Sequence, residues 1–72
     1  MEHHLLKKLG TNLRQIRQKR GLTQEKLAEK AQMHPVYISY IEKGSRNASI
    51  SKILNIAMAL ETTAEDIFKG IF

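Results

Sequence analysis

The sequence predicts an all-α fold, a compact five-helix bundle, and three observations support that prediction. Apolar residues recur at three- and four-residue spacing along most of the chain. Residues suited to begin or end a helix separate these periodic segments. No repeat, low-complexity tract or Pro/Ser-rich linker interrupts them. At 72 residues the chain is one domain at most, so we expect residues 1–72 to form a single small domain with a thin core.

The first helix is predicted over Leu5 to Arg20. One face carries an apolar stripe at helical spacing, made of Leu6, Leu9, Leu13 and Ile16. Gly10 interrupts the segment and should weaken the helix by up to ~1 kcal/mol relative to alanine. Gly21 is suited to end it in the left-handed conformation.

Two short helices are predicted between Thr23 and Gly44. Thr23 is a favourable N-cap, and a narrow apolar stripe follows at Leu27, Ala28 and Ala31. A turn of about three residues, Gln32 to His34, leads to Pro35, which suits a first helical position. The second helix then runs to Lys43, with Ile38 and Ile41 facing inward and Gly44 as the left-handed cap. Two short helices joined by a tight turn form a helix-turn-helix, which presents its second helix to the DNA major groove.

Two further helices are predicted in the last third of the chain. Ser49 would cap a helix over Ile50 to Leu60, whose core stripe we assign to Ile50, Ile53, Leu54, Ala57 and Leu60. Thr63 would cap the last helix, with Asp66 three residues on. Large apolar residues exceed what one small core needs, which predicts a symmetric dimer contact within residues 50–72, at Ile56, Ile67, Phe68, Ile71 and Phe72. The alternative is an apolar tail folded onto its own domain.

The positive charge is concentrated at the start of the chain. Residues 1–20 contain six basic residues and one acid, which accounts for the whole formal charge of +5, while the later residues are balanced. This balance suits an anionic partner such as nucleic acid, although a basic face is often only a solvated surface. There is no cysteine, so disulfides and thiolate metal sites are excluded.

The string LTQEKLAEKAQMHPVYISYIEKG closely resembles the phage-repressor, or xenobiotic-response-element, type of helix-turn-helix transcriptional regulator. The resemblance extends over Leu5 to Ile67. The run Arg46-Asn47 with Ser49 is also similar to controller proteins of restriction-modification systems. The resemblance implies a homodimer that binds double-stranded DNA at an inverted repeat, with the recognition helix over residues 35–43. It also implies a salt bridge between Arg17 and Glu42, for which the alternative is two separately solvated charges.

The same resemblance suggests which residues touch DNA. Those expected to contact bases are His34, Val36, Ser39, Tyr40 and Arg46, and those expected to contact phosphates are Gln24, Tyr37, Lys43, Arg46 and Asn47. The chain departs from many relatives at Pro35 and Val36, which offer no side-chain hydrogen bond to a base edge. DNA shape should therefore carry part of the specificity. For Tyr37 the alternative is simple packing against the core.

Other functions are less well supported. No Ser/His/Asp set, phosphate loop or pair of catalytic carboxylates is present, so we expect no enzyme, no cofactor and no small-molecule ligand. His3, His4 and His34 do not form a convincing metal site. No signal peptide or membrane span is evident, so a cytoplasmic protein is expected. It would act through occupancy of DNA, by blocking or contacting RNA polymerase. The principal alternative is a protein-interaction module of the same fold, such as an antitoxin or bridging factor.

Overall fold

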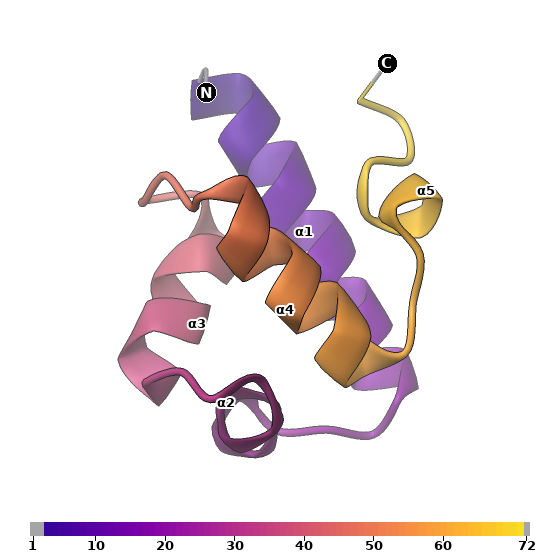
Figure 1. Ribbon diagram of the computed structural model, residues 1–72. Helices are drawn as coiled ribbons and strands as arrows, with labels where there is room; N and C mark the ends of the chain where they lie inside the picture. The colour runs from indigo at the N-terminus through magenta and orange to yellow at the C-terminus, as the bar shows by residue number, and fades with distance from the viewer. Residues whose placement is uncertain (1–2, 72) are drawn as a thin grey trace.

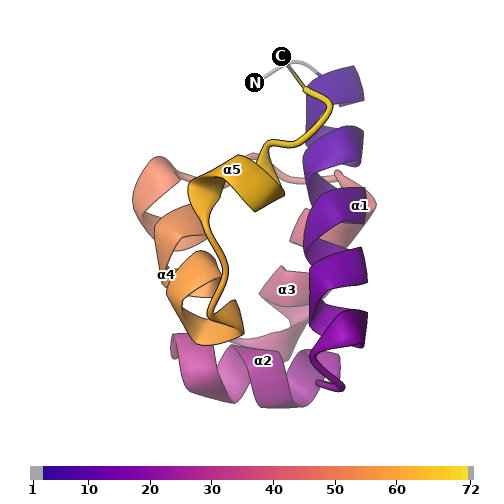
Figure 2. The same cartoon turned by 90° about the vertical axis from the view of Figure 1, so that its right-hand side faces the viewer.

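The computed structural model describes residues 3–71, which form five α-helices and no strand. They are α1 (His3–Lys19), α2 (Gln24–Ala31), α3 (Pro35–Lys43), α4 (Ile50–Leu60) and α5 (Ala64–Ile67). Helix α1 runs the length of the molecule, with α3 on one side of it and α5 on the other (Figure 1). Helix α2 lies across one end of the bundle, as the view turned by 90° shows (Figure 2). The predicted all-α architecture is confirmed, and α1 begins two residues earlier than expected. None of these helices is long and apolar enough to cross a bilayer.

The predicted caps begin the helices. Thr23 accepts a hydrogen bond from the amide of Lys26, Ser49 from that of Lys52, and Thr63 from that of Asp66. Each cap satisfies one of the free amides of the first helical turn, so each helix begins where a hydroxyl side chain can replace a missing backbone partner.

The core forms from one face of each helix. Its fully buried large side chains are Leu9, Leu13, Leu27, Ile38, Ile53, Ile56, Leu60 and Ile67. The predicted core stripe of α4 is confirmed at Ile53, Ala57 and Leu60. It is wrong at Ile50 and Leu54, which are 60% and 45% exposed, whereas Ile56 takes a core position at 1% exposed. Both assignments fit the helical period, because α4 is apolar on most of its circumference. Packing against α2 and α5 selects the stripe of Ile53, Ile56, Ala57 and Leu60.

Two residues predicted to contact a second chain are therefore unavailable. Ile56 and Ile67 are 1% and 0% exposed, and both belong to the core of this chain. Phe68 and Ile71 are half-buried and pack against the same core. For these two residues the tail folds onto its own domain, as the alternative prediction stated. Phe72 lies outside the described residues.

Helices α1 and α3 approach each other closely at two glycines. A Cβ atom on Gly10 would lie 2.4 Å from the carbonyl oxygen of Ile41, and one on Gly44 would lie 2.7 Å from the Cα atom of Lys7. Gly44 also has a φ of +71°, so it serves both as the left-handed cap of α3 and as a contact point. The helix-weakening Gly10 is thus required by the packing of α1 against α3.

Asn12 of α1 and Arg20, which directly follows α1, hold the last third of the chain in place. The amide of Asn12 donates to the carbonyl oxygens of Ile67 and Lys69, at 2.7 and 2.9 Å. Arg20 donates to the carbonyl oxygen of Glu61 at 2.7 Å. Because these carbonyls lie at or just after the ends of α4 and α5, the bonds replace intrahelical partners that the helix ends lack. The sequence analysis missed both roles.

Candidate nucleic-acid interface

The turn between α2 and α3 is fixed by the backbone and by one side chain. Gln32 adopts the left-handed conformation at φ +56°, and the amide of Met33 donates to the carbonyl of Ala28 at 2.8 Å. His34 is the N-cap of α3, where its ring Nδ1 accepts from the amide of Val36 at 3.2 Å. Nδ1 is therefore occupied within the protein, and Nε2 is the ring atom left to face a ligand.

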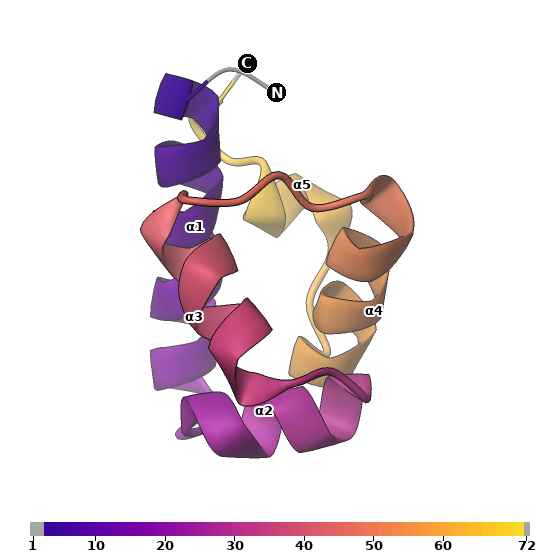
Figure 3. The same ribbon diagram turned by 90° about the vertical axis from the view of Figure 1, so that its left-hand side faces the viewer.

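Helix α3 has an inner face and an outer face. Ile38, Ile41 and Glu42 are buried, while Val36 and Tyr40 are 49% and 37% exposed and Lys43 is exposed. Val36, Tyr40 and Lys43 follow one another at i, i+4 and i+7, so they form a single outward stripe. Ser39 is half-buried at its edge. Helices α2 and α3 lie toward the viewer in Figure 3, where the outer side of this motif is visible.

A buried carboxylate fixes the inner face of α3. Glu42 accepts hydrogen bonds from Arg17 Nε at 2.6 Å and from Arg17 Nη2 at 3.1 Å, so the expected salt bridge is present and bidentate. Arg17 also donates to the carbonyl of Leu22 at 2.7 Å. The side chains of Arg17 and Glu42 are only 11% and 4% exposed. This pair thus ties α1 to α3 in a place where an unpaired charge would be costly.

Gln24 joins the same network. Its amide nitrogen donates to Glu42 Oε1 at 3.0 Å, which connects the first turn of α2 to α3. The sequence analysis expected Gln24 only as a phosphate contact. One of its two amide hydrogens is used inside the protein, and the second, together with the backbone amides of the first turn, remains for an anion.

The loop after α3 folds back onto the helix and positions Arg46. The amide and the hydroxyl of Ser45 both donate to the carbonyl of Tyr40, at 3.1 and 3.2 Å. One residue later, the guanidinium carbon of Arg46 lies 5.0 Å from the centroid of the Tyr40 ring. This cation–π contact places a planar group with five N–H donors beside the outward stripe of α3. Asn47 follows and is exposed.

A second cation–π contact involves the other tyrosine of α3. Lys52 Nζ, in the first turn of α4, lies 5.5 Å from the centroid of the Tyr37 ring. Tyr37 is half-buried and packs against the core, in agreement with the packing alternative of the sequence analysis. The contact of Lys52 with Tyr37 was not predicted, because no local pattern links Lys52 to a residue fifteen positions earlier.

The outer side of α4 carries an apolar stripe, two of whose residues, Ile50 and Leu54, were predicted to lie in the core. Ile50, Leu54 and Met58 recur every four residues, and Met58 is 75% exposed. Three large apolar side chains in one exposed row are unusual for a chain of this size and indicate a contact surface. Elsewhere, no three His, Cys, Asp or Glu side chains of residues 3–71 gather where they could hold a metal ion.

Comparison with known proteins reveals clear relatives. The model of the helix-turn-helix family matches residues 13–67. Control protein C.BamHI of Bacillus amyloliquefaciens is 44% identical over 59 residues, which are 81% of this chain and 73% of that protein. Control protein C.SmaI of Serratia marcescens is 38% identical over 55 residues, which are 76% of this chain and 66% of that protein.

Solved structures show the same likeness. The restriction-modification controller protein C.AhdI from Aeromonas hydrophila superposes with a TM-score of 0.85 at 38% identity, covering 88% of this chain and 96% of that chain. The controller protein C.Esp1396I, as a tetramer in complex with its natural 35 base-pair operator, gives a TM-score of 0.86 at 38% identity, covering 94% of this chain and 90% of that chain.

Proposed function

Because the chain belongs to the helix-turn-helix family, we propose that it is a sequence-specific regulator of transcription that binds an inverted-repeat operator as a homodimer. Helix α3 enters the major groove, and each subunit contacts one half-site. Two recognition helices related by a two-fold axis would lie about 34 Å apart, one turn of DNA. The protein acts in the cytoplasm and without catalysis, by occupying DNA and so blocking or contacting RNA polymerase.

The outward stripe of α3 beside Arg46 is the observation that carries this proposal. Val36 makes apolar contact with a thymine methyl, and Ser39 and Tyr40 supply hydroxyls. Arg46 supplies the bidentate donors that Pro35 and Val36 lack, and guanine is the base that best matches them. His34 reaches the DNA through Nε2, because its Nδ1 caps the helix.

Phosphate contacts surround this stripe. Gln24 lies in the first turn of α2, where free amides favour an anion, and Lys43 and Asn47 are exposed at the opposite end of the motif. Tyr37 contributes its hydroxyl from the rim of the core. Since several phosphates are neutralised by each dimer, DNA affinity should fall steeply with salt concentration.

The dimer contact is best supported at the outer stripe of α4, and not at Ile56 or Ile67. Ile50, Leu54 and Met58 are exposed in one row. In a dimer with two-fold symmetry, the same surface of both subunits forms the contact. The α4 row of one chain would therefore pack against the α4 row of the second chain and be buried there. The tetrameric assembly of C.Esp1396I on its operator supports self-association of this chain on DNA.

Selection of binding sites from a randomised duplex pool, at near-physiological salt, tests the proposal. The expected result is an enriched inverted repeat with half-sites about one turn apart, bound by two chains in a sizing measurement. Enrichment of no sequence, or only weak salt-sensitive binding to every duplex, would exclude a sequence-specific regulator. The protein-interaction alternative would then be preferred, and Arg46→Ala would leave binding to that partner unchanged.

The dimer contact has its own test. Leu54→Glu places a charge within the α4 stripe and should shift the free protein to monomers, as measured by analytical ultracentrifugation. Asn55→Glu adds the same charge at the next, exposed position of α4 and should leave the dimer intact. Equal dimerisation of the two variants would place the contact elsewhere.

A further inference from the structure

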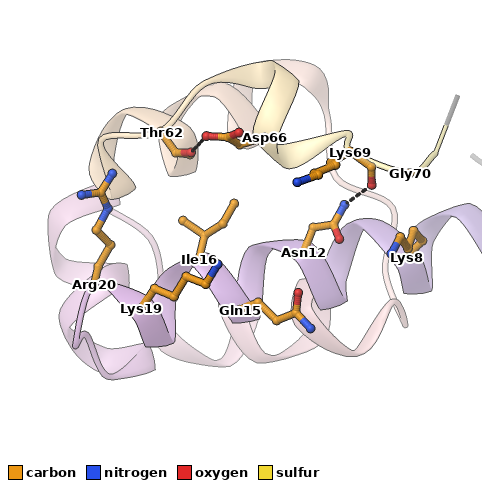
Figure 4. A pocket seen from close by; sticks show the side chains of 10 residues that line it. All are labelled: Lys8, Asn12, Gln15, Ile16, Lys19, Arg20, Thr62, Asp66, Lys69 and Gly70. Atoms are coloured by element: carbon orange, nitrogen blue, oxygen red, sulfur yellow. Dashed lines mark hydrogen bonds between the residues drawn. The ribbon is translucent and has the colours of Figure 1, made fainter.

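A polar cleft of about 690 Å³ lies between α1 and the α5 segment (Figure 4). The α5 segment is on the other side of α1 from α3 (Figure 1). Among residues 3–71, four basic side chains line this α1–α5 cleft, namely Lys8, Lys19, Arg20 and Lys69, against the single carboxylate of Asp66. Its net formal charge is thus +3. The cleft therefore holds a large part of the positive charge of a chain whose total is +5.

The position of this charge does not suit the DNA that α3 would contact. Helices α3 and α5 lie on opposite sides of α1 in Figure 1, and the two perpendicular views place them at opposite faces of the bundle (Figures 2 and 3). The basic surplus of α1, which the sequence analysis linked to nucleic acid, is therefore divided. Arg17 is paired with Glu42, whereas Lys8, Lys19 and Arg20 line the cleft on the far side.

The walls of the cleft are fixed by hydrogen bonds within the chain. Asn12 binds the carbonyls of Ile67 and Lys69 near the middle of the cleft, and Arg20 binds the carbonyl of Glu61 at one end. Asp66 accepts from the hydroxyl of Thr62 at 3.1 Å. A partner would therefore meet a preformed site and would not have to order its walls, which favours binding.

We propose that the α1–α5 cleft binds an extended acidic segment of a partner protein while α3 occupies DNA. The occupation of DNA by α3 rests on the proposed function, whereas the binding of a partner segment in the cleft does not. Lys8 and Lys19 are separated by three turns of α1, about 16 Å. An extended peptide of about five residues spans that length at ~3.3 Å per residue. Ile16 is half-buried in the floor, so the segment carries an apolar side chain among its acids.

The dimensions and chemistry favour a peptide over other anions. A small anion could contact only one or two of four cations spread over this length. A duplex would touch the rims of a cleft between two helices, and its phosphates would meet Asp66. A single extended chain can lie along the cleft and place its acids on both walls, where complementary charge also speeds association.

Fluorescence anisotropy with a defined peptide tests the proposal. The probe is a labelled octapeptide of glutamates with one central leucine, which presents acids on both faces of an extended chain. It is titrated into the free chain and into the chain bound to its selected operator. The double variant Lys8→Glu, Lys19→Glu should bind the peptide about tenfold more weakly, because attraction becomes repulsion. The control Lys26→Glu, Lys30→Glu makes the same change in net charge at exposed positions of α2, outside the cleft, and should lose less than about threefold.

Two further measurements sharpen the result. Asp66→Asn removes the one acid that lines the cleft in the described part of the chain, keeps an acceptor for Thr62, and should tighten peptide binding. The cleft double variant should retain operator affinity better than the α2 control. The proposal is overturned if the peptide does not bind, if both double variants lose equal affinity, or if the cleft variant loses duplex binding instead. Because the peptide is also titrated into the free chain, failure to select an operator leaves this test intact.

Discussion

The two faces of α3 differ in how their polar groups are held. On the inner face, Glu42 is buried and receives three hydrogen bonds, from Arg17 and Gln24. On the outer face, Tyr40 is exposed and holds Arg46 by a single cation–π contact. One helix therefore combines a rigid attachment to the bundle with an adjustable surface for DNA. Substitutions on the inner face should lower the free energy of unfolding, and substitutions on the outer face should lower the affinity for DNA.

Glu42→Ala should produce the largest effect. It leaves Arg17 in a part-buried position without its partner, which destabilises by about 3 kcal/mol or more. Urea unfolding followed by circular dichroism measures the loss. The control Glu29→Ala breaks an exposed pair with Lys26, whose charged atoms are 3.7 Å apart, and should change stability by less than about 0.5 kcal/mol. Similar losses in both variants would mean that the buried network does not anchor α3.

Gly10→Ala tests the close approach on the same inner face. Alanine normally favours a helix by up to ~1 kcal/mol over glycine, but here its Cβ would lie 2.4 Å from the carbonyl oxygen of Ile41. We expect a net destabilisation of about 2 kcal/mol in urea unfolding. Thr11→Ala, at the next and exposed position, should be neutral or slightly stabilising. A stabilised Gly10→Ala variant would show that α1 and α3 can separate at low cost.

Arg46→Ala tests the outer face of α3. Stability should change by less than about 0.5 kcal/mol, whereas affinity for the selected operator should fall by about 10- to 100-fold in an anisotropy titration. Arg46→Lys distinguishes the target of the contact. Lysine keeps a phosphate contact but loses the bidentate geometry that guanine requires. Full retention of affinity by Arg46→Ala would remove this residue from the interface.

Tyr40→Leu should have the smallest effect. Removal of the ring releases Arg46, and operator affinity should fall about two- to fivefold, the range of an exposed cation–π contact. Tyr40→Phe separates the two roles proposed for Tyr40, because it keeps the ring that positions Arg46 and removes only the hydroxyl proposed to contact a base. Affinity close to that of the original chain would mean that the ring accounts for the effect. If the phenylalanine variant is as weak as the leucine variant, the Tyr40 hydroxyl itself contacts DNA.

Local chemistry explains why much of the fold was predictable. Thr23, Ser49 and Thr63 act within their own helical turn, so the residue type and its neighbours suffice to locate each helix start. Gly44 ends α3 for an equally local reason. The pair of Arg17 and Glu42 was predictable only through resemblance to a family, because twenty-five residues separate them.

The rotation of α4 could not be predicted in the same way. Ile50, Leu54 and Met58 form one valid helical stripe, and Ile53, Ile56 and Leu60 form another. The free energy of burial is similar for both, since it depends on apolar area and not on the order of the residues. The neighbouring helices decide which residues are covered. Because they bury Ile56 and leave Leu54 exposed, the dimer contact is proposed at Leu54 instead of Ile56.

The sequence by itself determined the five helices, their caps and the helix-turn-helix motif, since these depend on residues within one or two turns of each other. Only the tertiary structure decided which face of α4 is exposed and that α3 packs closely against Gly10. It also decided that Arg46 contacts the Tyr40 ring and that Lys8 and Lys19 of α1 line a cleft on the side away from α3. Each of these depends on which helices meet in space, and the periodicity of one helix carries no information about its neighbours.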